Sequence, residues 1–210
     1  NNALTGLFEP IADNTFETVQ GELRAGHFKP ENVSEGQPPS ARSIGFTKQV
    51  WRDAGKFPED LYTGEDAKFC RKVEEAGHDW HIVQGAMVQW HMRPSWKDYW
   101  NQFKRYGEGD ARAGGLLDYP AKILGVSKLF WRTIATWSGI LGILLIPLHP
   151  GSLLGAVAGF GAQLAFKAGA LRSSVEQVGM KAVPYWIGLV LTGSLGHFTG
   201  YYTEGTRGLF

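Results

Sequence analysis

The sequence contains very little cysteine. Cys70 is the only cysteine among 210 residues, which excludes an internal disulfide bond and a zinc site made of several cysteines. The sequence also lacks an excess of charge of either sign, because 21 Lys and Arg residues face 20 Asp and Glu residues, a formal net charge of +1. Nucleic-acid binding is therefore not indicated, since it usually requires a concentrated basic face.

Charged residues are missing from two long stretches. No Asp, Glu, Lys or Arg occurs from Thr133 to Phe166 or from Ala182 to Thr203. No basic segment followed by an apolar run marks a signal peptide at the start of the chain. The chain begins with Asn1 rather than Met, which we interpret as entry partway into a longer protein. The concentration of charge in the first part of the chain and its absence from these two stretches predict a polar domain at residues 1–115 and a membrane anchor at residues 116–210.

The predicted anchor contains three apolar runs, at about residues 129–148, 152–171 and 183–202. Each run has roughly the 20 residues that a helix needs to cross a hydrocarbon core of about 30 Å. We therefore expect two to three transmembrane helices. One alternative is that a run inserts only at the interface or as a re-entrant segment, and another is a buried helical hairpin of a soluble protein.

The loops between these runs differ in charge. The first loop has no Lys or Arg, whereas the second contains Lys167, Arg172 and Lys181. The positive-inside rule then places the polar domain on the cytoplasmic side of a multi-pass protein of the cell membrane. Small residues at Gly155-x-x-x-Gly159 and Gly196-x-x-x-Gly200 predict close helix packing.

The polar domain combines short strands with helices that have recognisable ends. We expect strands near 4–8, 44–46 and 80–88, and helices beginning near Asn14, Lys48, Glu65 and Trp96. Three of these helices have predicted N-terminal caps, which are Asn14 together with Glu17, Thr47 alone, and Ser95 together with Asp98. We expect Gly107-Glu108-Gly109 to end the last helix, and the Pro- and Gly-rich segment Glu31 to Ser40 to be a loop.

An acid pair follows a glycine at the start of one predicted helix. Glu65 and Asp66 come directly after Gly64, where a rigid backbone and a small neighbour suit a general base that a substrate can approach. The alternative is electrostatic, because carboxylates are favoured in the first turn of any helix.

Two further groups of polar residues follow the acid pair. His91 ends a predicted strand, and a neutral imidazole is a common metal ligand. Gln102 and Arg105 lie three residues apart on a predicted helix, so we expect them to share a face, on a different arc from the aromatic residues. Arg105 offers a planar fork to phosphate oxygens. The alternatives are a structural histidine at a strand edge and an amphipathic helix at the membrane surface.

Taken as a set, these motifs resemble the C-terminal half of a membrane-associated family 2 glycosyltransferase. The resemblance covers residues 1–115. It rests on the turn from Gly55 to Glu59, the triplet Gly64-Glu65-Asp66, the strand leading to His91, and the segment Gln102 to Tyr106. That last segment is similar to the Gln-x-x-Arg-Trp motif of processive and lipid-linked members, with Tyr106 in place of Trp. The fold that this implies is α/β, the Rossmann-like GT-A fold, followed by the membrane helices.

The resemblance also implies roles for individual residues. Asp66 matches the catalytic base that deprotonates the acceptor hydroxyl, and Glu65 matches its neighbour. His91 matches a position that completes a metal shell or contacts the diphosphate. Substrate-binding positions are matched by Gln102, Arg105 and Tyr106 of the second motif and by Gly64 of the first. The implied reaction is an inverting transfer from a nucleotide-sugar donor to a lipid or glycan acceptor.

One element of that family's pattern is missing. Members bind the donor and a divalent metal, Mg or Mn, through an Asp-x-Asp motif, but no two aspartates of this chain lie two residues apart. We therefore expect the nucleotide-binding half to lie outside the chain, and the chain alone to be inactive. The alternative functions are a processive polysaccharide synthase and a non-catalytic membrane protein whose soluble domain binds a partner.

Overall fold

The structure is a computed structural model that describes residues 3–25, 40–113, 122–123 and 126–207. The chain forms two compact units, Asn1–Met92 and Arg93–Phe210. Each unit is described by itself below. Most of the loop expected at Glu31 to Ser40 lies outside the described residues.

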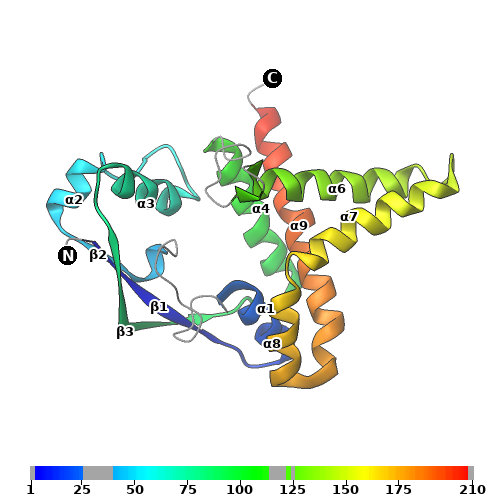
Figure 1. The fold of residues 1–210 in the computed structure, drawn as a ribbon, viewed down its shortest axis with the longest axis horizontal. Helices are drawn as coiled ribbons and strands as arrows, with labels where there is room; N and C mark the ends of the chain where they lie inside the picture. Colours follow the sequence, from blue (N-terminus) through cyan, green and yellow to red (C-terminus); the bar gives the residue numbers. More distant parts are fainter. Residues whose placement is uncertain (1–2, 26–39, 114–121, 124–125, 208–210) are drawn as a thin grey trace. The chain divides into compact units, whose positions relative to one another are not determined.

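A small mixed sheet forms the centre of the first unit (Figure 1). Strand β1 (Ala3–Ile11) is the middle strand, with β2 (Ile44–Phe46) on one side and β3 (Trp80–His91) on the other. β1 pairs antiparallel with β2 and parallel with β3. The expected strands are confirmed, although β1 and β3 extend further than the apolar pattern predicted. The parallel pairing places Ile11 opposite His91 at the carboxyl ends of both strands.

The three α-helices of this unit begin where the sequence predicts, whereas one short 3-10 helix was not predicted. The α-helices are α1 (Thr15–Ala25), α2 (Lys48–Asp53) and α3 (Glu65–Glu75), and the 3-10 helix is η2 (Ala41–Ser43). The side-chain oxygen of Asn14 accepts the Glu17 backbone N–H at 3.0 Å. The Thr47 hydroxyl oxygen likewise accepts the N–H of Val50 at 3.3 Å. These bonds satisfy backbone donors that the first turn of a helix leaves unpaired.

A buried apolar cluster holds α2 and α3 against the sheet. Its buried members are Ala3, Val50, Ala54, Phe69 and Val73, with Phe46, Trp51, Phe57 and Trp80 packed around them. Within this cluster the Phe57 ring stacks on the Phe69 ring of α3, with centroids 4.0 Å apart.

The second unit is mainly helical. Its elements are α4 (Trp96–Arg112), β4 (Lys122–Ile123), β5 (Val126–Ser127), α6 (Lys128–Leu144), η3 (Pro150–Ser152), α7 (Leu153–Ala165), α8 (Ala168–Val178), η4 (Gly179–Lys181) and α9 (Ala182–Arg207). The Ser95 cap of α4 is confirmed, since its hydroxyl oxygen accepts the N–H of Asp98 at 3.1 Å.

Helices α4 and α9 pack together along most of their length. A Cβ atom at Gly107 would overlap the carbonyl oxygen of His197, and one at Gly200 would overlap the carbonyl oxygen of Lys104. Only glycine allows two backbones to approach this closely. The Gly196-x-x-x-Gly200 pattern therefore does mediate helix packing, and its partner is the polar helix α4.

The same contact explains an error in the predicted end of α4. Gly107 and Gly109 are both buried within the helix, which continues to Arg112. Gly107 was expected to terminate the helix, but it is instead the point where α9 comes nearest. Glycine is unfavourable inside a helix by about 1 kcal/mol, and close packing against α9 offsets this cost.

Helices α6 and α7 form a hairpin whose tip extends away from α4 and α9 (Figure 1). Small residues make the contact between the two arms: Gly159 lies against Ala135 and Gly139, and Gly142 lies against Ala156. The expected turn at Pro147 to Gly151 is confirmed. The second apolar run is not one helix, because α7 ends at Ala165 and α8 begins at Ala168.

One helical segment among the described residues is long and apolar enough to cross a membrane. It covers Ala168–Gly205, has a mean hydropathy of 1.2 in its best window, and is one-third buried there. This is weak evidence for a single membrane anchor, because the central helix of a soluble protein has the same properties.

The close approach of α4 and α9 gives a test of the fold. We expect Gly200→Ala to lower the free energy of unfolding by about 1–3 kcal/mol, because its methyl group has no room against Lys104. Gly161→Ala is the matched control, since Gly161 lies within helix α7 and faces open space. That change should be neutral or stabilising by up to about 1 kcal/mol. Thermal unfolding followed by circular dichroism measures both, and equal effects would contradict the packing described.

Candidate active site

The acid pair lies in the first turn of α3, and a glycine in a left-handed conformation precedes it. Gly64 is the residue before the helix and has φ +79° and ψ +3°, a conformation that L-residues with side chains rarely adopt. One oxygen of Asp66 accepts the N–H of Ala67 at 2.8 Å. Within the described residues, neither Glu65 nor Asp66 forms an ion pair. Asp66 therefore keeps one carboxylate oxygen outside the local hydrogen bonding.

The aromatic cluster fixes the position of this turn. Phe69 is fully buried one turn after the acid pair, between Phe57 at 4.0 Å and Phe46 at 5.0 Å between ring centroids. Offset and tilted aromatic pairs of this kind add about 0.5–1.5 kcal/mol each beyond their buried area. The half-exposed carboxylates are thus attached to a well-packed helix, which suits a catalytic base.

Cys70 lies on the same helix, one turn after Asp66. Burial, the carboxylate of Asp66 and the carboxylate of Glu74 together raise the pKa of its thiol from 9.0 to about 12, and burial is the largest cause. A thiol in this environment stays protonated and is a poor nucleophile at neutral pH. Cys70 is therefore a core residue and not a candidate nucleophile.

His91 is the exposed last residue of β3, paired with Ile11. No hydrogen bond or ion pair joins it to Glu65 or Asp66 in the described part of the first unit. Among residues 3–25, 40–113, 122–123 and 126–207, no group of three or more His, Cys, Asp or Glu side chains could hold a metal ion. The metal-ligand role of His91 stays a prediction.

Gln102 is buried on α4, with only 7% of its surface exposed. Its amide nitrogen donates to the hydroxyl oxygen of Tyr106 at 3.2 Å. Its amide oxygen is buried and has no hydrogen-bond partner among the described residues. Buried acceptors in native proteins are nearly always satisfied. Gln102 therefore has the unused acceptor that a donor group on a ligand would need.

The arrangement around Gln102 corrects one expectation. Gln102 is buried together with Tyr99 and Phe103, so it shares the arc of the aromatic stripe rather than lying apart from it. Arg105, three residues on, is exposed. The two side chains thus occupy adjacent positions on α4 in very different surroundings.

The candidate residues fall into two groups. Gly64, Glu65, Asp66 and His91 belong to the first unit, and the Gln102, Arg105 and Tyr106 group belongs to the second. The structure supports the local geometry of each group separately.

Comparison with known proteins identifies the family. The family model described as "Glycosyl transferase family group 2" matches residues 26–195, which is more than half of the chain. The chain belongs to glycosyl transferase family group 2. No curated protein matches the chain, and no solved structure matches it either.

Membership of this family confirms the predicted class of enzyme, a family 2 glycosyltransferase domain with a sugar donor and an acceptor. The matched region includes both groups of candidate residues. It also continues through α6, α7 and α8 into α9. The family's sequence pattern therefore includes the apolar helices as well as the polar domain.

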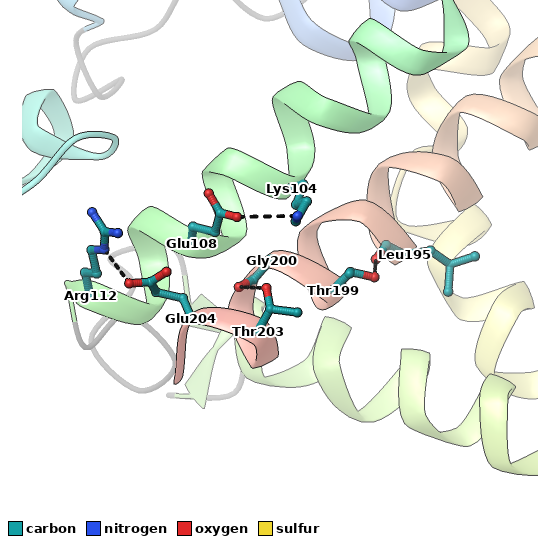
Figure 2. A network of polar contacts seen from close by, with 8 residues as sticks. All are labelled: Lys104, Glu108, Arg112, Leu195, Thr199, Gly200, Thr203 and Glu204. Atoms are coloured by element: carbon teal, nitrogen blue, oxygen red, sulfur yellow. Dashed lines mark hydrogen bonds and ion pairs between the residues drawn. The ribbon is translucent and has the colours of Figure 1, made fainter. Parts of the chain in front are cut away.

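One buried polar pair of the glycosyltransferase was not predicted from the sequence. His197 of α9 lies 2.7 Å from Asp110 of α4, nitrogen to oxygen. The only sequence indication was a histidine within a charge-free run, and its partner is 87 positions away. Figure 2 draws an ion pair within α4, between Lys104 and Glu108 beside Gly200, and a second contact between the two helices, in which Arg112 of α4 meets Glu204 of α9 at 2.8 Å. These contacts help to hold the helix that carries Gln102 in place.

The environment of Cys70 predicts a pH dependence of stability. Because the folded state raises the thiol pKa from 9.0 to about 12, the neutral thiol's contribution is fully present below pH 9. It is lost as the pH rises toward 12, by up to about 1.4 kcal/mol per pH unit. The free energy of unfolding, measured with urea, should therefore fall more steeply over this pH range for the natural protein than for Cys70→Ala. Parallel pH curves for the two proteins would show that the thiol is not buried as described.

Proposed function

We propose that this glycosyltransferase moves a sugar from a nucleotide-sugar donor to a lipid or cell-envelope acceptor, with inversion at the anomeric carbon. The family match supports sugar transfer. The observation that carries the assignment of the base is the Asp66 carboxylate, which is half-exposed on a well-packed helix with one local hydrogen bond.

The reaction proposed is a single displacement. The oxygen of the acceptor hydroxyl forms a bond to the anomeric carbon while the bond from that carbon to the donor's diphosphate breaks. The hydroxyl proton moves to Asp66, and the nucleoside diphosphate leaves with the bonding electron pair. Glu65 orients the acceptor or the base, and Gly64 leaves room for the acceptor to approach. General base catalysis of this kind contributes typically 10²–10⁴-fold in rate.

The residues on α4 are proposed to bind the substrates. The unpartnered amide oxygen of Gln102 would accept a hydrogen bond from a sugar hydroxyl. The guanidinium of Arg105 matches the geometry of phosphate oxygens and would bind the departing diphosphate. Tyr106 positions Gln102 through the hydrogen bond between their side chains.

A divalent metal is proposed to accompany the donor, but the described residues do not fit a metal site by themselves. His91 is a single exposed imidazole, and no cluster of ligands surrounds it in the described ranges. No step is therefore assigned to a metal here. The family's Asp-x-Asp carboxylates are not found in the chain, so activity is best assayed with the protein at its natural full length.

A membrane-associated acceptor is favoured by the apolar character of the second unit, in which residues 133–166 carry no charge. We propose that the enzyme is a protein of the cell membrane with its polar unit on the cytoplasmic side. A processive polysaccharide synthase is the second candidate, because the segment from Gln102 to Tyr106 is similar to a motif of such enzymes.

The role of Asp66 can be tested by a conservative substitution. We expect Asp66→Asn to lower the rate of sugar transfer by about 10²–10⁴-fold, while donor binding stays unchanged. The amide oxygen of Asn can still accept the N–H of Ala67, so the fold should be retained. Glu65→Gln is the control for loss of a neighbouring charge, and it should cost much less. Turnover by Asp66→Asn at the natural rate would disprove the assignment.

The role of Gln102 can be separated from its structural contribution. We expect Gln102→Met to change the unfolding temperature little, because removing a buried acceptor that has no partner among the described residues offsets the loss of the hydrogen bond to the half-buried Tyr106. Its KM should rise by roughly tenfold, as for a lost hydrogen bond of about 1.4 kcal/mol. Asn101→Met, at the exposed neighbouring position, is the control. A Gln102→Met protein with natural KM and lowered stability would identify Gln102 as structural.

A further inference from the structure

The hairpin of α6 and α7 has its small residues inside and its large apolar residues outside. Its arms meet mainly through glycine and alanine, as at Gly142 with Ala156, and the ring of Phe160 lies against Gly139. The exposed fractions of Leu144, Leu148 and Leu154 are 64%, 81% and 76%. In water, large apolar side chains are buried preferentially, whereas helices in lipid associate through small residues. The arrangement of this hairpin is the one suited to lipid.

Several polar side chains of the hairpin are paired within the second unit, although the buried hydroxyl of Ser152 has no partner among the described residues. The amide of the buried Gln163 donates to the carbonyl oxygen of Arg132 at 2.7 Å and to the Thr136 hydroxyl at 2.9 Å, and it accepts from Ser194 at 3.0 Å. The Ser138 hydroxyl donates to the carbonyl oxygen of Gly155 at 3.0 Å. Hydrocarbon offers no hydrogen bonds, so internal pairing is a requirement there.

Most backbone N–H groups of the turn at the tip are also paired. The backbone N–H groups of Leu145, Ile146, Leu148, His149 and Ser152 all donate to carbonyl oxygens within the hairpin. The two prolines of the turn have no N–H to satisfy. Pairing of these groups within the hairpin suits a turn in hydrocarbon, where no water replaces a missing bond.

Helix α9, the helix of membrane-spanning length, is in different surroundings. Helix α4 covers it along much of its length. Apart from Trp96, the exposed side chains of α4 are all polar or charged: Lys97, Asp98, Asn101, Arg105 and Arg112. Figure 2 shows charged pairs of α4 beside Gly200 of α9. Carrying these charges into hydrocarbon would be costly, so α9 is better suited to be the scaffold of the unit.

The charges that flank the hairpin indicate what kind of surface it meets. The stretch from Thr133 to Phe166 has no charge, and the nearest charged residues on its two sides are Arg132 and Lys167, both basic. Basic residues at the ends of an apolar segment complement the anionic headgroups of a cytoplasmic leaflet.

We propose that the α6–α7 hairpin is the element that enters the bilayer, with its tip held among the acyl chains of an anionic membrane. The arms have 17 and 13 residues, or about 25 and 20 Å at 1.5 Å per residue. The shorter arm is therefore less than a hydrocarbon core of about 30 Å, and the hairpin returns to the side from which it entered. Helix α9 stays outside the hydrocarbon, with α4 packed against it. This inference does not depend on sugar transfer.

The test uses the full chain with Cys70→Ala and single cysteines at exposed positions, so that folding is preserved. Leu144→Cys and Leu154→Cys report on the two arms near the tip, and Asn101→Cys reports on the α4 surface. Each protein is labelled with an environment-sensitive fluorophore and bound to phosphatidylcholine vesicles containing phosphatidylglycerol. Quenching by lipids with spin-labelled acyl chains is then measured, together with reaction of the unlabelled cysteines with a membrane-impermeant maleimide.

We expect the labels at 144 and 154 to be quenched by the lipid chains and the cysteines there to be protected on both sides of the vesicle, whereas Asn101→Cys reacts freely and is not quenched. Reaction of the tip cysteines in water would overturn the proposal. So would reaction from the far side of the bilayer, which would show that the hairpin spans it. Protection without lipid quenching, accompanied by disulfide cross-links between chains, would assign the surface to a second copy. Quenching at position 101 would make α9 the inserted helix instead.

Discussion

The backbones of α4 and α9 meet at Gly107 and Gly200, and the second unit depends on this contact. It attaches the helix that carries Gln102 and Arg105 to the long apolar helix, and buried polar contacts such as the pair of His197 and Asp110 accompany it. A side chain at either glycine would separate the helices. The position of the proposed substrate-binding residues therefore follows from two residues that have no side chain.

This contact also determines how the apolar part of the chain should be interpreted. An apolar helix that is covered by a charged helix does not have the surroundings of a simple membrane span. The hairpin of α6 and α7 has the opposite character, because its contacts are small and its large side chains face outward. Hydropathy alone treats both segments alike, and the difference between them comes from what is packed against each.

Local features of the sequence predicted local structure well. Asn14, Thr47 and Ser95 were expected to begin helices and do so, because a cap depends on residues within one turn. Gly107 was assigned wrongly to a helix end, because its true partner, α9, is about 90 positions away in the sequence. Spacing alone did not show that Gln102 would be buried beside the aromatic stripe, since the surface that covers it is formed by tertiary packing.

The candidate site was predicted as a set of residue types, and all of them lie within the region that the family model matches. The structure adds that Asp66 is held by the Phe57 and Phe69 stack and that Gln102 has a buried oxygen without a partner in the described part of the chain.

The most direct test of the account is a transfer assay with the natural full-length protein in vesicles that contain a membrane lipid extract. A panel of radiolabelled nucleotide sugars is supplied, and the label is followed into the lipid-soluble fraction. The account predicts that one donor gives a labelled lipid or glycolipid product whose anomeric configuration is opposite to that of the donor. Retention of configuration would contradict the single displacement. A failure to consume any nucleotide sugar with lipid or glycan acceptors would contradict the proposed function itself.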